Sequence, residues 1–434
     1  MRQLRSPAPD HSRPRRPRAL LALALNLLAA PLLLTACETA PHAVQTQAAQ
    51  QPVPVILVSL DGFRADYIQR GLTPNLARLA RTGVTTTGMH PSFPSITFPN
   101  HYTLVTGDRP DRHGIVGNTM TDPAMPGVTF RMSAKNVTAN ARWWDEATPI
   151  WVTAERHGLH TATMFWPGSD VAIDDVRPTD WLPYDNDMTS DDRTEKLLSW
   201  FDVSPDQRPR FATLYLNAVD SAGHEGGPDS PDVRAALAEV DEAVGRLIAG
   251  LQARHITANV VIVADHGMAA VGAGQSIALS DLMPKRDVTL VTGGAYAGID
   301  PRAGADAVVA RALLGRHAHM QCWRKADVPA RFAYGRNPRV PAFVCLADVG
   351  WTIDADHTVP HHPHKGTHGY DPMAPEMQAL FIAHGPAFDG GRMIAPFDNV
   401  DVYPLLMHLL GLPPEPDDGT IAPFTPVLTP ETHP

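Results

Sequence analysis

The sequence lacks internal repeats, a coiled-coil pattern and a glycine-rich dinucleotide-binding loop, which disfavours a repeat protein, a long helical rod and a Rossmann-type cofactor enzyme. Positive charge is also scarce. The 434 residues include 36 Lys and Arg against 46 Asp and Glu, a net charge of -10. An acidic surface argues against a nucleic-acid polymer as the main partner. It does not exclude a small phosphate ligand, because bound metal ions can reverse the local field.

The N-terminal segment has the pattern of an export signal. Residues 2–18 are basic and rich in proline, residues 19–36 are apolar, and Leu-Thr-Ala-Cys at 34–37 resembles a bacterial lipobox. We expect residues 1–36 to be a signal peptide, Cys37 to carry lipid and residues 37–52 to be a flexible tether. Plain secretion is the alternative. Either way the mature chain loses six Arg and one Asp and reaches a net charge of -15.

This pattern places the protein outside the cytoplasm. We expect a periplasmic or outer-membrane-anchored lipoprotein of a Gram-negative bacterium, which would touch a membrane only through Cys37. Only two other cysteines occur, Cys322 and Cys345. If Cys37 is lipidated, these two remain as a pair in an oxidising compartment, where a disulfide between them is expected. Two buried thiols are the alternative.

Apolar runs and helical periodicity alternate along the chain. The run 53–60 is rich in β-branched residues and contains Pro54, which favours a strand buried on both faces over a short buried helix. Further strands are expected at 160–165, 211–216, 259–264 and 378–383, and helices at 74–82, 232–254 and about 400–410. Strands alternating with helices predict an α/β fold with a mostly parallel central sheet and helices on both faces.

We expect one catalytic domain over residues 53–412. From 268 to about 365 the alternation is less regular, and proline, arginine and aromatic residues become common. This stretch is expected to form a smaller inserted lobe of short strands with one helix near 303–316. Residues 413–434 are rich in proline and threonine and are expected to be a C-terminal tail.

Thr97 lies in a segment with restricted backbone conformation. Because Pro94 and Pro99 flank it, the segment cannot be the interior of a regular helix or of a central strand. It must be a shaped loop or the first turn of a helix, from which the threonine hydroxyl projects.

Carboxylate and imidazole side chains follow the expected strands. Asp61 comes after the strand at 53–60, Asp220 follows 211–216 by a short turn, and Asp265 and His266 follow 259–264. In open α/β sheets, ligands gather outside the carboxyl ends of strands, so these side chains are expected to meet at one edge.

Two more histidines extend this set. His224 lies four residues after Asp220, in a stretch whose glycines favour a loop. His368 is the one histidine of the 357–368 tract that has the surroundings of a positioned ligand. Taken singly, Asp61 could belong to an ordinary turn and the histidine tract to an exposed loop. Together, three carboxylates, three imidazoles and one hydroxyl are the ligands of a two-zinc hydrolase.

Seven motifs in a fixed order carry a resemblance. They are DGFR at 61–64, TFPNH at 97–101, HGIVGN at 113–118, WPGS at 166–169, DSAGH at 220–224, DHGM at 265–268 and GTHG at 366–369. In this order they resemble the nucleotide pyrophosphatase/phosphodiesterase family of the alkaline phosphatase superfamily, over about residues 53–411. The resemblance implies an alkaline-phosphatase-like fold. The residues at 217–219 depart from the acidic residue and proline that members often carry there.

The resemblance also implies roles for single residues. One zinc ion would be held by Asp61, Thr97, Asp265 and His266, and the other by Asp220, His224 and His368. Thr97 resembles the nucleophile, and Asn118 resembles the donor to a non-bridging phosphate oxygen. Residues that flank a nucleotide base in the family have three counterparts here, namely Phe98, Tyr215 and Tyr184, by the same resemblance.

The chemistry of these groups agrees with the resemblance. A threonine hydroxyl is a poor nucleophile at neutral pH, and coordination to zinc stabilises its alkoxide. Nitrogen and carboxylate ligands without thiolate suit zinc, although manganese is not excluded. We expect hydrolysis of nucleotide phosphodiester or pyrophosphate bonds to nucleoside 5′-monophosphates through a phospho-threonine intermediate.

Three other functions stay open. A phosphodiesterase for lipid head groups such as glycerophosphocholine needs an aromatic or acidic cage for the quaternary ammonium. A phosphomonoesterase of the same superfamily needs a charged group for the extra phosphate oxygens, whereas Asn118 is neutral. A non-enzymatic surface binding module would have lost ligands, and none of the seven is missing. A sulfatase is excluded because Thr97 cannot supply the aldehyde that such enzymes make from cysteine or serine.

Overall fold

The computed structural model describes residues 53–358 and 365–430. The predicted signal peptide at 1–36, the lipidated Cys37 and the tether at 37–52 lie outside the described residues. Three histidines of the 357–368 tract, at 361, 362 and 364, lie outside them as well. Within the described residues, no helix combines the length and the apolar character needed to cross a membrane.

An eight-stranded sheet forms the centre of the fold, in the order β20-β2-β19-β9-β1-β8-β6-β7. The strands from β9 to β7 run parallel, and they are β9 (Asn259–Val263), β1 (Val55–Leu60), β8 (Phe211–Leu216), β6 (Thr161–Met164) and β7 (Asp180–Trp181). Antiparallel β19 (Phe381–His384) joins β9 to β2 (Val84–Thr86), beyond which lies β20 (Arg392–Ile394). Every residue of β1 and β9 is buried, as expected of parallel strands covered on both faces.

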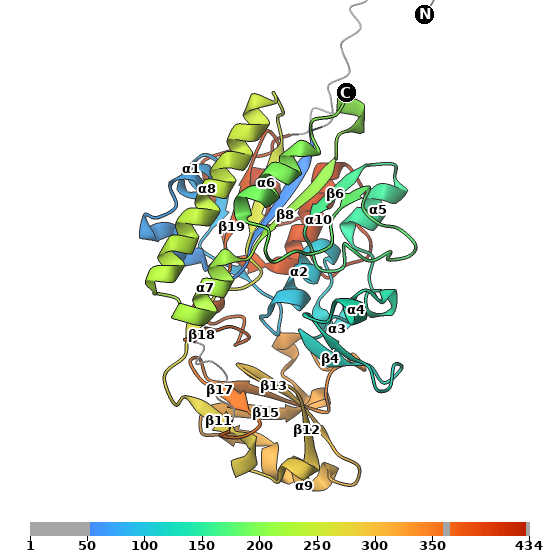
Figure 1. Ribbon diagram of the computed structural model, residues 1–434, viewed down its shortest axis with the longest axis vertical. Helices are drawn as coiled ribbons and strands as arrows, with labels where there is room; N and C mark the ends of the chain where they lie inside the picture. Colours follow the sequence, from blue (N-terminus) through green and yellow to red (C-terminus); the bar gives the residue numbers. More distant parts are fainter. Residues whose placement is uncertain (1–52, 359–364, 431–434) are drawn as a thin grey trace, which may run out of the picture. The chain divides into compact units, whose positions relative to one another are not determined.

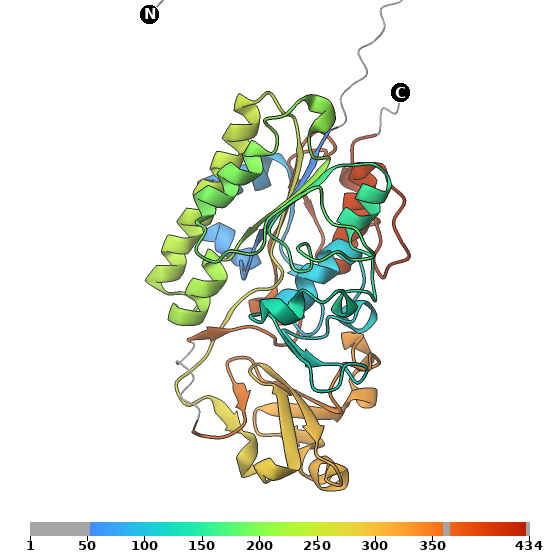
Figure 2. The same cartoon turned by 45° about the vertical axis from the view of Figure 1, so that its right-hand side comes forward.

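Helices cover both faces of this sheet (Figures 1 and 2). On one face the long α8 (Pro231–Ala253) packs against α1 (Pro74–Thr82), α6 (Ser190–Ser199) and α7 (Ala218–Gly226). On the other face α2 (Thr97–Thr106) packs against α10 (Val402–Leu410), and α5 (Ile150–Arg156) lies on the same side. The predicted α/β fold, a mostly parallel sheet between helices, is confirmed.

Local signals explain where the longest helix begins. The Ser230 hydroxyl accepts a hydrogen bond from the backbone N of Val233 at 3.1 Å, and Pro231 occupies the first helical position. The predicted boundaries of this helix and of 74–82 hold within two residues. The strand expected from 378 begins later, at Phe381, because Ala379 before it forms only isolated bridges to Arg64 and Met89.

A second sheet of five antiparallel strands, with α9 (Asp306–Leu313), forms a smaller lobe. Its order is β12-β13-β16-β15-β14, and its strands are β12 (Val288–Thr292), β13 (Tyr296–Pro301), β16 (Phe343–Ala347), β15 (Met320–Arg324) and β14 (Gly315–His317). Cys322 and Cys345 are opposite each other in β15 and β16 and form a disulfide. The pairing of these cysteines is therefore confirmed, and the alternative of two thiols is excluded.

Short ribbons complete the architecture. Antiparallel β10 (Ala269–Ala270) and β18 (Gly366–Thr367) form one, and parallel β11 (Ser276–Ala278) and β17 (Thr352–Asp354) form another. The described residues also form β3 (Met89–His90) with β21 (Phe397–Asp398), β4 (Thr119–Thr121) with β5 (Thr129–Arg131), and the single-turn helices α3 (Pro110–His113) and α4 (Lys135–Thr138).

The segment after residue 412 is not a loose tail as far as the structure describes it. Phe424 and Val427 are buried in the main hydrophobic core. The backbone N of Thr429 donates to the carbonyl of Ala387 at 2.9 Å, which ties the segment to the end of β19. The predicted tail is thus corrected for residues 413–430. The proline-rich composition gave no sign that Phe424 and Val427 would be buried. A chain stiffened by proline loses less conformational entropy when it becomes ordered.

Candidate metal centre

The candidate ligands meet at the carboxyl end of the parallel strands. Asp61 follows β1 directly, while Asp265 and His266 follow β9. Asp220 lies near the start of α7, just after β8, and His368 follows β18 rather than a strand of the main sheet. Ligand atoms of these residues lie within 4.8 Å of one another in overlapping groups.

Asp220 and His224 lie on a helix, not on the loop that the glycines predicted. The helix tolerates Gly223 because that residue faces Met268, where an added Cβ would come within 2.9 Å of the methionine side chain. The glycine therefore permits close packing, which outweighs its low helix propensity. The spacing of four residues then puts both ligands on one helical face, with His224 Nε2 3.4 Å from Asp220 Oδ1.

The Nε2 atoms of two imidazoles face each other. The Nε2 atoms of His224 and His368 are 3.1 Å apart, and each Nδ1 faces a backbone carbonyl at 3.0 Å, of Gly366 and of Ser95 respectively. A ring that donates through Nδ1 carries a lone pair on Nε2. Burial and the neighbouring His266 and His224 hold the pKa of His368 well below its usual range, so the ring is neutral. Two Nε2 atoms this close, with both Nδ1 atoms at backbone carbonyls, are arranged as two ligands of one cation would be.

His266 lies at the centre of a second group. Its Nε2 is 2.9 Å from Asp265 Oδ2, 3.6 Å from Asp61 Oδ1 and 3.3 Å from the Thr97 hydroxyl. Burial, followed by the charges of Asp265 and Asp220, raises the pKa of Asp61 well above its usual range. Although burial opposes it, the neighbouring His266 and His101 hold the pKa of Asp265 well below its usual range. The carboxylates of Asp61 and Asp265 have oxygens within 4.8 Å of each other, and ionised carboxylates at that distance repel one another unless positive charge is present.

Three buried carboxylate oxygens accept no well-aligned hydrogen bond among the described residues, although His266 Nε2 lies 2.9 Å from one of them, Asp265 Oδ2. They are Asp61 Oδ1, Asp220 Oδ1 and Asp265 Oδ2. Buried oxygens of this kind are strongly unfavourable unless a donor or a metal ion reaches them. The orphaned oxygens and the imidazole lone pairs face the same small volume, and carboxylate with imidazole is a donor set that transition metals accept. The residues present therefore fit a metal site.

His101 belongs to this centre, although the sequence assigned it no role beyond its motif. It is fully buried, with Nδ1 2.9 Å from the carbonyl of Thr97 and 3.3 Å from Asp265 Oδ2, and Nε2 2.8 Å from the Ser59 hydroxyl. Its spacing of four residues from Thr97 on a helix was the signal available in the sequence. Side chains that hold a ligand in place in this way tune metal affinity.

Thr97 is the first residue of α2. Its segment is therefore the first turn of a helix and not a shaped loop. Asn100 fixes the turn before it, accepting from the backbone N of Ser92 at 2.7 Å and donating to the carbonyls of Pro94 and Ile96 at 2.9 Å. Asn118 Oδ1 accepts from the backbone N of Phe98 at 2.9 Å, which holds the Asn118 side chain beside the start of α2. A helix N-terminus and an amide donor beside Thr97 favour bound anions.

Two of the three predicted aromatic residues are in ring contact with each other. The rings of Tyr184 and Tyr215 are in edge contact at 6.1 Å, whereas Phe98 packs against Phe130 and Trp144 at 5.9 and 6.1 Å. No ring contact joins Phe98 to either tyrosine in the part of the chain that the structure describes. Tyr215 has an unpredicted contact, because its hydroxyl donates to Asp61 Oδ2 at 2.6 Å.

A buried arginine holds the two tyrosines in place. Arg193 on α6 is 2% exposed, and its guanidinium lies 5.7 Å from the ring centre of Tyr184. It donates to the carbonyl of Tyr215 at 3.1 Å and to Asn217 Oδ1 at 2.9 Å.

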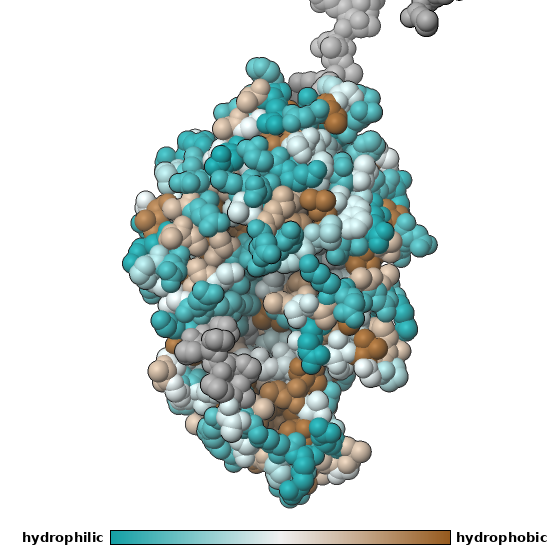
Figure 3. Space-filling view, in the orientation of Figure 1, coloured by the Kyte–Doolittle hydropathy of each residue, from teal (hydrophilic) through white to brown (hydrophobic). Residues whose placement is uncertain are grey.

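Figure 3 shows a hollow in the surface between the main sheet and the smaller lobe, at the level of α7 and β18, with hydrophobic side chains on its lobe side.

Known proteins are similar to this chain in sequence. The family model for type I phosphodiesterase / nucleotide pyrophosphatase matches residues 55–371. The chain is 39% identical over 384 residues to an uncharacterized pyrophosphatase/phosphodiesterase of Schizosaccharomyces pombe, covering 84% of this chain and 78% of the relative. It is 37% identical over 371 residues to the bis(5′-adenosyl)-triphosphatase of Xenopus laevis, covering 85% and 80% respectively.

A solved structure has a similar fold. Murine ectonucleotide pyrophosphatase / phosphodiesterase 5 matches with a TM-score of 0.83 and 35% identity, covering 87% of this chain and 100% of that chain. That structure is described as inactive, with a threonine-to-alanine substitution, and is in complex with AMP.

Proposed function

The chain belongs to the type I phosphodiesterase / nucleotide pyrophosphatase family of hydrolases, and on that premise we propose that it uses Thr97 and two zinc ions to release nucleoside 5′-monophosphates from nucleotide diesters or pyrophosphates. One observation carries the proposal. Six Asp and His ligands from separate segments converge beside the Thr97 hydroxyl, with His266 Nε2 3.3 Å from it.

The ligands divide into two sets. Asp61, Asp265, His266 and Thr97 would hold one ion, and Asp220, His224 and His368 the other. When bound, zinc supplies positive charge that stabilises an alkoxide and the charge developing on a phosphoryl group. We propose zinc as the metal because imidazole and carboxylate ligands without thiolate suit it.

The Thr97 oxygen gives up its proton to solvent and forms the new bond to phosphorus while the bond to the leaving-group oxygen breaks, and the leaving group takes a proton from solvent. The charge then grows on the non-bridging oxygens, where the start of α2 and the Asn118 amide can donate. Water afterwards attacks phosphorus and frees Thr97 and the monophosphate. The inactive threonine-to-alanine form of the murine relative supports this role, provided that its threonine is the counterpart of Thr97.

The nucleotide part of the proposal rests on the wall beside Asp61. Tyr184 and Tyr215 offer aromatic edges there, and Arg193 fixes both. A base can stack on such side chains. The relatives support the choice of nucleotides, since one is named for a bis-adenosyl triphosphate and another holds AMP. Asn118 is neutral, which suits the single charge of a diester better than the extra charge of a monoester.

A substrate comparison tests the proposal. The zinc-loaded protein is assayed with p-nitrophenyl thymidine 5′-monophosphate, p-nitrophenyl phosphate and p-nitrophenyl phosphocholine. We expect turnover of the first to exceed that of the others by about a hundredfold in kcat/KM, a difference of about 2.7 kcal/mol. Preference for the second or third substrate would replace the proposal with a phosphomonoesterase or a lipid head-group phosphodiesterase.

We also propose that the protein is an exported lipoprotein anchored at Cys37. The Cys322–Cys345 disulfide supports export, because such bonds persist in oxidising compartments. Metabolic labelling with palmitate should mark the wild-type protein and leave Cys37→Ala unlabelled. Equal labelling of both would contradict the anchor.

A further inference from the structure

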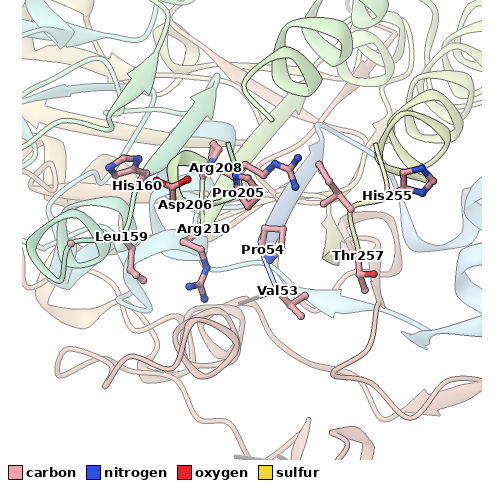
Figure 4. A pocket seen from close by; sticks show the side chains of 13 residues that line it. Val53, Pro54, Leu159, His160, Pro205, Asp206, Arg208, Arg210, His255 and Thr257 are labelled. Atoms are coloured by element: carbon pink, nitrogen blue, oxygen red, sulfur yellow. The ribbon is translucent and has the colours of Figure 1, made fainter. Parts of the chain in front are cut away.

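A cavity opens at the end of the parallel strands opposite the metal centre. Its volume is about 360 Å³, and it is lined by the residues that lead into four strands (Figure 4). These are Val53 and Pro54 before β1, residues 158–160 before β6, 205–206 and 208–210 before β8, and 255–257 before β9. Parallel topology gathers the amino ends of the strands here, just as it gathers their carboxyl ends at the metal centre.

Arg210 is a cation without a partner in this cavity. Its backbone is fixed, with its N donating to the carbonyl of His160 at 2.8 Å and its carbonyl accepting from Val55 N at 2.9 Å. Its guanidinium makes no hydrogen bond and no ion pair within the described residues, and its Nε is buried without an acceptor. Burial lowers the pKa of Arg210, and no nearby carboxylate opposes that shift.

Neighbouring charges are directed to other partners. Arg208 donates to the carbonyl of Phe201 at 3.1 Å. Arg254 and Arg208 both lower the pKa of Asp202. Asp206 lies beside His160, as Figure 4 shows, and the two guanidinium groups of Arg208 and Arg210 point in different directions. Among the described residues, no carboxylate compensates the positive charge of Arg210.

We propose that this cavity is a second, non-catalytic site that binds a phosphate group through Arg210. A guanidinium presents a planar set of donors that matches phosphate oxygens in pairs. His160 and His255, which also line the cavity, can donate further hydrogen bonds. Apolar walls from Val53, Leu159 and Ile256 lower the local dielectric and strengthen a charged hydrogen bond. The volume is in the range of small-ligand sites.

The phosphate can come from two sources. A soluble phosphate compound can enter the cavity, or the head group of an anionic lipid can do so, since the chain enters the fold at Val53 on this face. Both share the same chemistry at Arg210. Neither depends on the proposed hydrolysis, because the site lies at the other end of the strands.

Stability without ligand provides the first readout. A buried donor without an acceptor destabilises the fold. Arg210→Met should therefore melt at the same temperature as the wild type or higher in phosphate-free buffer, and should not unfold the protein. A lower melting temperature would show that Arg210 has a structural partner and would overturn the proposal.

The second readout is stabilisation by inorganic phosphate at constant ionic strength, with the metal-loaded protein. A ligand that binds only the folded state raises Tm by an amount that grows with the logarithm of one plus its concentration divided by Kd. The wild type and the control Arg286→Met, at a residue 83% exposed, should respond alike. Arg210→Met should need at least about tenfold more phosphate for the same shift, and Arg210→Lys should be intermediate. Phosphate at the metal centre contributes equally to all four proteins, so an unchanged response of Arg210→Met would overturn the proposal.

Vesicles distinguish the two sources. Binding to phosphatidylglycerol vesicles that exceeds binding to phosphatidylcholine, and that is lost in Arg210→Met, identifies a lipid head group. An Arg210-dependent Tm shift without vesicle binding identifies a soluble phosphate compound. Turnover should be the same in all variants, and its loss in Arg210→Met would contradict a separate site.

Discussion

The hydroxyl of Tyr215 donates a 2.6 Å hydrogen bond to Oδ2 of Asp61. The other oxygen of that carboxylate, Oδ1, has no donor among the described residues and lies 3.6 Å from His266 Nε2. Tyr215 therefore decides which oxygen of Asp61 faces the metal centre. The ring of Tyr215 also contacts Tyr184, so the same side chain joins the metal centre to the proposed base-binding wall.

Replacing Tyr215 with Phe should weaken metal binding. The carboxylate of Asp61 would lose its fixed orientation, and loss of such a supporting hydrogen bond lowers metal affinity by about 10–100-fold. Competition with a chelator measures the affinity. The matched control is Tyr184→Phe, which removes a hydroxyl that donates to Asn186 Oδ1 at 3.0 Å. The assigned role of Tyr215 fails if both variants retain metal as tightly as the wild type.

Asn118 offers an isosteric test of transition-state stabilisation. Asn118→Asp keeps the oxygen that accepts from the backbone N of Phe98 but replaces the amide donor with a second oxygen. We expect kcat to fall by about 100–1000-fold, as it does when a single oxyanion donor is removed. Thermal unfolding should be nearly unchanged. Turnover within about threefold of wild type would show that the amide does not donate to the reacting phosphate.

The disulfide should stabilise the smaller lobe without affecting the chemistry. Cys322 and Cys345 close a loop with a sequence separation of 23, and bridging a loop of that size contributes about 3 kcal/mol to the free energy of unfolding. Denaturant unfolding of a variant with alanine at both positions should show that loss. Turnover well below its melting temperature should be unchanged. Reductant should destabilise the wild type but not the variant, and equal sensitivity would contradict the assignment.

Stability should fall as pH rises because of Asp108. Burial raises the pKa of Asp108 from 3.8 to about 7, against the effect of Arg112 at 2.9 Å. The folded state binds this proton more tightly than the unfolded state. The resulting stabilisation is fully present below pH 3.8 and is lost as pH rises to about 7. Asp108→Asn should flatten this decline in the free energy of unfolding, and an identical pH profile would contradict the raised pKa.

The sequence predicted the elements whose signals are local. The continuous apolar run of β1 and the Ser230-Pro231 start of α8 contain their own evidence, and the ligands at the strand ends followed from topology. Features that depend on contacts across the chain could not be predicted. The helix around Gly223 depends on Met268, the burial of Phe424 depends on the core that receives it, and the bond from Tyr215 to Asp61 joins neighbouring strands.

His101 is an intermediate case. Its distance of four residues from Thr97 indicated a shared helical face only once the segment was known to be helical. The sequence left a loop open there, because the flanking prolines allow either conformation. Its 3.3 Å approach to Asp265 joins residues far apart in the chain, which spacing alone cannot predict.

Turnover of Thr97 variants tests the central claim most directly. Thr97→Ala and Thr97→Ser are assayed with p-nitrophenyl thymidine 5′-monophosphate after zinc content has been matched to the wild type. The claim predicts measurable hydrolysis by Thr97→Ser and a loss of at least about 1000-fold, or 4 kcal/mol, in Thr97→Ala. Retention of most of the wild-type turnover by Thr97→Ala would contradict a threonine nucleophile at this metal centre.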